Sequence, residues 1–180
     1  FSFHSCLLTG AGPRSRGVLS DCPIRKSTMH SFEEILDLAA DRHGGPEAIA
    51  AMLPKIRPKA EVAEIPDAIW LQTMAMRIFS TGMNTKMIEA KEDDIVAAFE
   101  GFEVGRVALM SDEWFDALLQ DKRIIRNAPK LRAIQENAVF IQEVSAEAGG
   151  FGRKIADWPD DRFGELLLWL KSEGSRLGGT

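Results

Sequence analysis

The longest periodic pattern of the sequence lies between Leu118 and Val144. From Pro129 onward, apolar residues recur at steps of three and four: Leu131, Ile134, Ala138 and Ile141. This spacing places them on one face of an α-helix that packs against a core. The chain is therefore expected to be organised around one long helix in this region.

Basic residues gather where this helix begins, and no acidic residue lies among them. They are Lys122, Arg123, Arg126, Lys130 and Arg132. The free N–H groups and the dipole of a helix N-terminus favour an anion such as a phosphate. On spacing alone, a solvated basic surface explains the cluster equally well.

The remainder of residues 29–180 also has helical spacing, and no stretch alternates as a strand does. Helices are expected near residues 32–43, 46–53, 66–80, 85–91, 93–100, 111–120 and 161–172, with an extended connector from Pro54 to Ile65. Ser31 with Glu34 is typical of a capping box. The faces expected to be buried include Phe32, Ile35, Leu36 and Ala39 in the first helix, and Phe163, Leu166, Leu167 and Leu170 in the last. The prediction is an all-α bundle of about eight short helices.

Composition limits the classes that remain. A chain of 180 residues suits one domain, and no apolar run approaches the ~18 residues of a membrane span. The net charge of −5 argues against a basic coat for nucleic acid but allows a local patch. Residues 1–28 have no sustained periodicity and are expected to be a disordered or non-native leader, with Met29 as the start of the domain.

Cysteine and histidine usage indicates no metal site and no cofactor. Cys6 and Cys22 both lie in the leader, which suits a domain in a reducing cytoplasm. His30 and His43 are isolated, and lone surface histidines are more often solvated than ligating.

Three stretches together resemble the DNA-3-methyladenine glycosylase I family. Its members are helical base-excision repair enzymes of the helix-hairpin-helix type. The three stretches are STGMNTKMIEAK (80–91), AAFEGFE (97–103) and the run from Val107 to Ala138, of which IIRNAPKLRAIQENA (124–138) is the most specific part. The resemblance extends over about Trp70 to Thr180.

A DNA glycosylase must turn its target nucleotide out of the base stack and fill the gap. The resemblance implies that Gly82 and Met83 form the DNA wedge, and that Arg77, Phe79, Asn84 and Thr85 line the base pocket. Without it, a helix-capping glycine followed by a core methionine is the better interpretation. The family's pocket glutamate falls at Arg77 and its tryptophan at Thr85, and the chain has no tyrosine. An arginine beside a cationic alkylated base would repel it.

The remaining implied contacts are to DNA phosphates, from Arg123, Arg126, Asn127, Lys130, Gly178 and Gly179. The two glycines stand where a hairpin would begin, so that hairpin is expected to be incomplete; a flexible chain end explains them equally well. No catalytic residue can be assigned. The expected function is a monomeric glycosylase that removes an alkylated purine such as 3-methyladenine from damaged double-stranded DNA. The alternative is a non-catalytic helical module that binds damaged DNA or a protein partner.

Overall fold

The computed structural model describes residues 30–53 and 56–178, which form two compact units divided after Pro54. The predicted leader lies outside the described residues. Whether residues 29–180 make up a single domain stays a prediction.

The first unit is a pair of helices, α1 (Phe32–His43) and α2 (Pro46–Met52), which pack on one another. The predicted capping box is confirmed, because Ser31 Oγ accepts from the Glu34 N–H while Glu34 accepts from the Ser31 N–H. The predicted buried face of α1 is wrong: Phe32 is 73% exposed, and Ile35 and Leu36 are also exposed. Two short helices have too little surface to enclose such a face.

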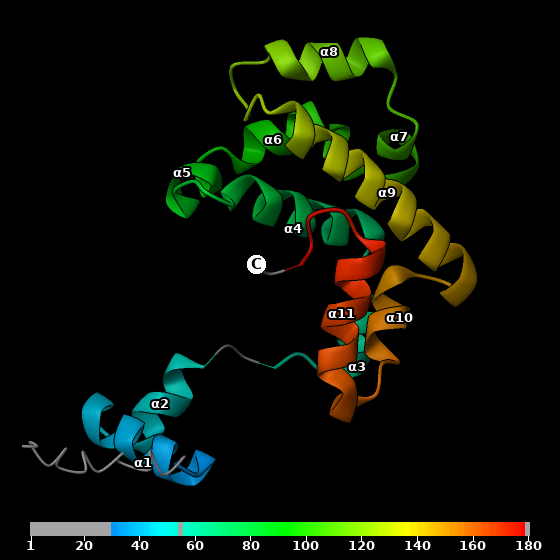
Figure 1. The fold of residues 1–180 in the computed structure, drawn as a ribbon. Helices are drawn as coiled ribbons and strands as arrows, with labels where there is room; N and C mark the ends of the chain where they lie inside the picture. The colour runs from blue at the N-terminus through cyan, green and yellow to red at the C-terminus, as the bar shows by residue number, and fades with distance from the viewer. Residues whose placement is uncertain (1–29, 54–55, 179–180) are drawn as a thin grey trace, which may run out of the picture. The chain divides into compact units, whose positions relative to one another are not determined.

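The second unit is built around α4 and α9, which pack across one another (Figure 1). Its α-helices are α3 (Lys59–Ala63), α4 (Asp67–Ser80), α5 (Thr85–Glu89), α6 (Glu92–Ala98), α7 (Val104–Ala108), α8 (Asp112–Gln120), α9 (Ala128–Ala148), α10 (Phe151–Ala156) and α11 (Phe163–Glu173). Two 3₁₀ turns, η1 (Glu100–Phe102) and η2 (Asp160–Arg162), complete it. The described residues contain no strand, so the all-α prediction is confirmed.

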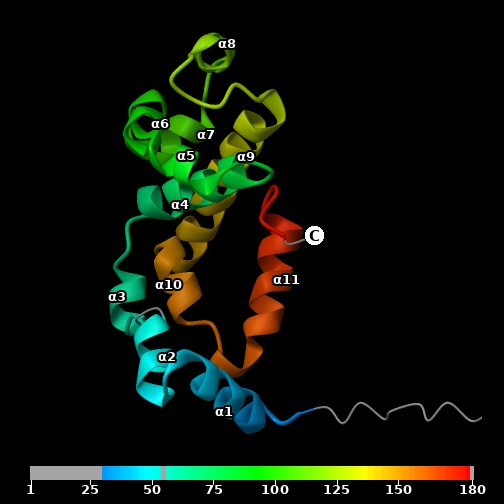
Figure 2. The ribbon, with the colours of Figure 1, turned by 90° about the vertical axis from the view of Figure 1, so that its left-hand side faces the viewer.

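The core of this unit contains the predicted face of α9, whose Leu131, Ile134, Ala138 and Ile141 are all fully buried. It meets Leu71, Ala75, Ile78 and Phe79 of α4. The helices α5 to α8 lie toward one end of α9, and α3, α10 and α11 toward the other (Figures 1 and 2). The two long helices thus fix where the turn after α4 and the connector before α9 stand.

The prediction of about eight helices is too low for the described residues, which hold eleven α-helices. The predicted extended connector contains α3, and α7 and α10 were not expected. These helices have only five or six residues, too few for a 3.6-residue period to show in the sequence. Tertiary packing stabilises them instead: α10 lies against α3, and a Cβ on Gly152 would come within 2.5 Å of the Val62 carbonyl oxygen.

The predicted buried face of α11 is confirmed only at Leu166. Phe163 is 62% exposed and Leu167 is 50% exposed, and Leu170 is half-buried. The reason is that this face borders a cavity. Among the described residues, no helix combines the length and apolarity that crossing a bilayer requires.

Candidate functional site

The turn from Thr81 to Asn84 presents a glycine and a methionine outward. It follows α4, whose last turn is closed by the Thr81 N–H donating to the Arg77 carbonyl (3.2 Å). Gly82 has φ = +74°, a conformation that favours glycine, and a Cβ there would meet nothing within 4 Å. Met83 is 37% exposed, so the interpretation as a core methionine is wrong. The conformation of the turn therefore follows from its own residues, and its surface is accessible to a ligand.

Asn84 closes this turn by capping α5. Its side-chain oxygen accepts from the Lys86 N–H at 3.0 Å, and the residue is outside the cavity that contains Thr85. Only four residues separate the end of α4 from the start of α5, so the Gly82–Met83 pair is held between two helix ends.

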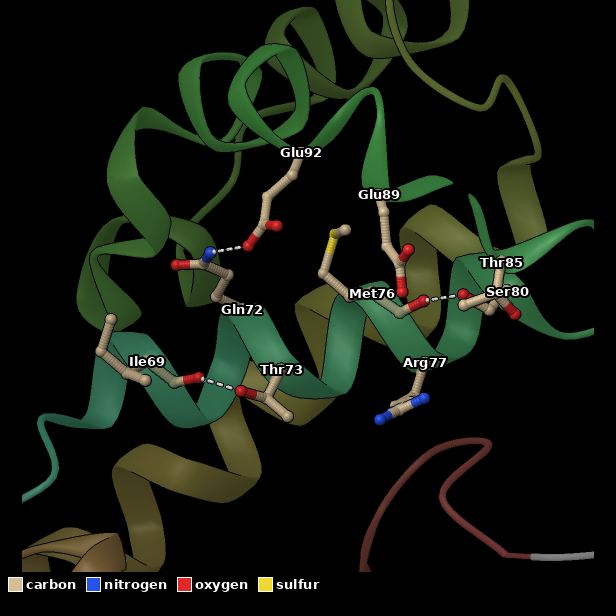
Figure 3. Close-up of a pocket in the computed structure, with 9 residues that line it drawn as sticks. All are labelled: Ile69, Gln72, Thr73, Met76, Arg77, Ser80, Thr85, Glu89 and Glu92. Carbon is tan, nitrogen blue, oxygen red and sulfur yellow. Dashed lines mark hydrogen bonds between the residues drawn. The ribbon is translucent and has the colours of Figure 1, made fainter. Parts of the chain in front are cut away.

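A cavity of about 320 Å³ lies beside the turn, between α4 and the α5–α6 segment (Figure 3). We call it the polar cavity because most of the residues that line it have polar side chains. It brings together two of the four predicted base-pocket residues, Arg77 and Thr85. Its other lining residues are Ile69, Gln72, Thr73, Met76, Ser80, Glu89 and Glu92.

Two carboxylates project into this cavity from α5 and α6. Glu92 Oε1 accepts a hydrogen bond from Gln72 Nε2 at 2.7 Å, whereas Glu89 has no ion-pair partner within the described residues. In Figure 3 the Arg77 side chain points to the side of α4 away from Gln72 and Met76, toward the C-terminal segment. The cavity therefore combines carboxylate oxygens with an arginine whose charge is directed elsewhere.

The base-pocket prediction for Phe79 is wrong. Phe79 is fully buried and packs on Phe99, with ring centroids 6.4 Å apart. The helical period explains this, because Phe79 lies four residues after Ala75 on the core face of α4, whereas Arg77 is exposed.

A second cavity, of about 540 Å³, lies on the other side of α4, against α11 and the segment after it. Apolar side chains line most of it, including Trp70, Met74 and Leu166. Arg77 and Arg176 are its two cationic residues, and no acidic residue lines it. The predicted phosphate contact Gly178 borders this cavity and is exposed, whereas Gly179 lies outside the described residues.

The connector Asp121–Asn127 carries the predicted phosphate-binding residues, with Arg123, Arg126 and Asn127 exposed. Asn127 is the N-cap of α9, since its side-chain oxygen accepts from the Lys130 N–H at 3.1 Å. Asp121, which directly precedes this basic set in the sequence, accepts from Arg123 Nη2 at 2.7 Å, and this bond holds the pKa of the Asp121 carboxyl below its usual value.

Lys130 is not exposed with the other basic residues. Its side chain is buried, and its ammonium donates to the carbonyl oxygens of Phe79 (2.9 Å) and Thr81 (2.7 Å). Its prediction as a direct phosphate contact is therefore wrong. The same bonds bring the start of α9 against the Thr81–Asn84 turn, so the predicted wedge and the basic connector lie in one region.

Glu89 and Glu92 were missed by the sequence reasoning. Their placement depends on how the short α5 and α6 fold back over α4, which no spacing in the sequence specifies. Among the described residues, no three His, Cys, Asp or Glu side chains gather as metal ligands do.

Comparisons with known proteins give one family match and several similar folds. The family described as methyladenine glycosylase matches residues 63–162, more than half of the chain. A crystal structure of 3-methyladenine DNA glycosylase I is 22% identical, with a TM-score of 0.55 over 65% of this chain and 74% of that one. The Staphylococcus aureus enzyme, solved for its recognition of 3-methyladenine, is also 22% identical, with a TM-score of 0.54 over 62% and 69%. No curated protein sequence matches the chain.

Proposed function

The chain belongs to the methyladenine glycosylase family, and from this premise we propose which part of it opens DNA and which part receives the base. Its function is that of a base-excision repair glycosylase, a hydrolase acting on DNA. In our proposal the Thr81–Asn84 turn enters damaged double-stranded DNA, and the polar cavity of α4, α5 and α6 receives the extruded base.

The wedge assignment is supported by the form of the turn. Gly82 lacks a side chain that would keep a DNA backbone away, and the exposed Met83 is unbranched and apolar, as intercalating side chains often are. The cavity with Thr85 begins two residues further on, so an extruded base has a short path to it.

The polar cavity suits a cationic N-alkylated purine, and this is the observation that carries the proposal. The carboxylate of Glu89 would attract the positive charge of the base, whereas the guanidinium of Arg77 is directed away from Gln72 and Met76. The repulsion expected from Arg77 is thereby reduced. The volume of about 320 Å³ is at the lower end of ligand sites, as a purine requires.

The reaction on such a base needs no proton donor. The N-glycosidic bond of a cationic nucleoside breaks with its electron pair passing to the base, which leaves neutral. A water oxygen bonds to the sugar carbon and one proton is released to solvent. The protein contributes by binding the extruded base and by preventing that base from returning to its stacked position in the duplex.

The direct test is to incubate the protein with duplex DNA methylated at adenine N3 and to measure release of free 3-methyladenine. Release with turnover is expected. Tight binding to the damaged duplex without any release would instead favour the non-catalytic module. We further propose that the enzyme acts as a monomer. We also propose that it acts in the cytoplasm, because residues 29–180 contain no cysteine, as suits a reducing compartment.

Met83→Ala is expected to lower the rate of base release by about tenfold, because a shorter side chain fills the vacated stack less well and costs about 1.4 kcal/mol of barrier. Affinity for undamaged duplex should stay within about twofold, since phosphate contacts dominate it. Single-turnover kinetics with a filter-binding assay separate the two quantities. An equal loss of both would contradict the wedge assignment.

Arg126→Ala is expected to weaken binding to all duplex sequences to a similar extent. Arg126 is exposed on the connector, and removal of one phosphate contact should reduce the slope of log K against log salt by about 0.9. Titrations of labelled duplex at several salt concentrations measure that slope. Asp121→Asn serves as the matched control, because it removes a negative charge from the same connector and should not lower the slope. An unchanged slope for Arg126→Ala would remove the residue from the phosphate site.

A further inference from the structure

The buried ammonium of Lys130 joins two elements that the proposed function uses separately. Lys130 lies in the first turn of α9, next to the connector, and its bonds end on the Phe79 and Thr81 carbonyls, on either side of Ser80. Carbonyls at a helix C-terminus have no partner within the helix and carry the negative end of its dipole. A cation is therefore well matched to the end of α4, one residue before Gly82.

The surroundings of this ammonium are otherwise unfavourable to a charge. Burial lowers the pKa of Lys130, and the nearby Arg176 lowers it further. Within the described residues Lys130 has no carboxylate partner. Lysine is among the residues least often buried without one. The two bonds to the Phe79 and Thr81 carbonyls offset this unfavourable burial, and they fix the end of α4.

A second lysine ties the same two regions from the other side of the turn. Lys91, which immediately precedes α6, donates from Nζ to the Arg123 carbonyl of the connector at 2.7 Å. The segment Thr81–Lys91 is thus held at both of its ends, to the start of α9 by Lys130 near Gly82 and to the connector by Lys91 beyond α5. Both links run from a side chain to a backbone carbonyl, so they fix the path of the main chain.

We infer that Lys130 is a positioning residue: it fixes the Thr81–Asn84 turn to the DNA-binding connector, so that gripping phosphates and inserting Met83 occur as one rigid movement. The inference rests on the proposed function, in which the turn is the wedge. Lys130 contacts neither base nor phosphate in this role, and it acts through the backbone that carries Gly82 and Met83.

The first test needs no DNA and measures hydrogen exchange of the turn in the free protein. The Thr81 N–H donates to the Arg77 carbonyl and the Met83 N–H to the Ser80 carbonyl (3.0 Å), so both amides report on the turn. In Lys130→Met we expect these amides to exchange about tenfold faster, while the amides of residues 134–141 in α9 stay protected. Lys122→Met, which removes an exposed lysine from the same connector, should match the parent protein. Unchanged exchange at Thr81 and Met83, or a uniform increase over the whole second unit, would overturn the inference.

The second test separates gripping from opening on DNA. A duplex with 2-aminopurine beside an N3-methylated adenine brightens when the base stack is disrupted. Lys130→Met should bind this duplex within about twofold of the parent protein while the amplitude of brightening falls by about fivefold, because phosphate contacts are retained. Lys130→Arg, which keeps the charge and donors, should recover part of the amplitude.

The outcomes distinguish the two ideas. If the parent protein neither opens the duplex nor releases base, the proposed function is wrong. If the parent protein does both and Lys130→Met does both equally well, only the positioning role of Lys130 is wrong. A parallel loss of affinity and opening, with normal folding, would also contradict that role.

Discussion

Glu89→Gln should lower kcat/KM for release of a cationic N3-alkylated adenine by about 30-fold. The carboxylate of Glu89 projects into the polar cavity and has no cation partner among the described residues. A hydrogen bond or contact between charged groups contributes about 1.5–3 kcal/mol, and 1.36 kcal/mol corresponds to a tenfold change in rate. Glutamine keeps the size and an acceptor oxygen but loses the charge, so the change isolates electrostatic recognition.

Two controls test whether the loss of kcat/KM in Glu89→Gln comes from recognition of the base. Binding of Glu89→Gln to a duplex with an abasic site should equal that of the parent protein, because this DNA has no base for Glu89 to recognise. Glu136→Gln changes a glutamate on α9 that does not line the polar cavity, and it should leave kcat/KM within about twofold. Equal kcat/KM values for Glu89→Gln and the parent protein would show that the base does not enter this cavity.

Asn137→Ala should reduce the free energy of unfolding by about 3 kcal/mol and the Tm by an amount on the order of 10 °C. Asn137 is fully buried in α9 and bonds both backbone groups of Ser175: Nδ2 donates to the Ser175 carbonyl and Oδ1 accepts from the Ser175 N–H, each at 2.8 Å. Alanine leaves those two groups without their partner and leaves a cavity in the core. Chemical and thermal unfolding followed by circular dichroism measure the change.

Ser145→Ala is the matched control on the same helix. The Ser145 hydroxyl is buried and has no hydrogen-bond partner among the described residues. Its removal should therefore change the free energy of unfolding by less than about 0.5 kcal/mol or raise it, since alanine also favours helix. If Asn137→Ala were no more destabilising than Ser145→Ala, the bonds to Ser175 would contribute nothing to stability.

The sequence predicted those parts of the molecule that depend on local rules. The buried face of α9 follows from a period sustained over three turns, and the capping box at Ser31 follows from two residue types at one spacing. The chain reversal at Gly82 follows from the conformational freedom of glycine, and the structure gives that residue a positive φ. Each of these three features can be predicted from residues that are close together in the sequence.

The candidate site was predicted only in part, because its composition depends on contacts between distant residues. Lys130 is 51 residues from Phe79, whose carbonyl it binds, and a basic run gives no sign that one of its members turns inward. Glu89 enters the cavity only because α5 folds back over α4. Phe79 was assigned to the pocket by its nearness to Gly82 in the sequence, although its position on α4 faces the core.

Helix α4 is a wall common to both cavities, and Thr73 and Arg77 line each of them. A molecule in one space that drew the Arg77 side chain toward itself would remove that side chain from the other space. Molecules held in the two spaces would then act as mutual antagonists, each weakening the other's affinity by the same factor, as thermodynamic linkage requires.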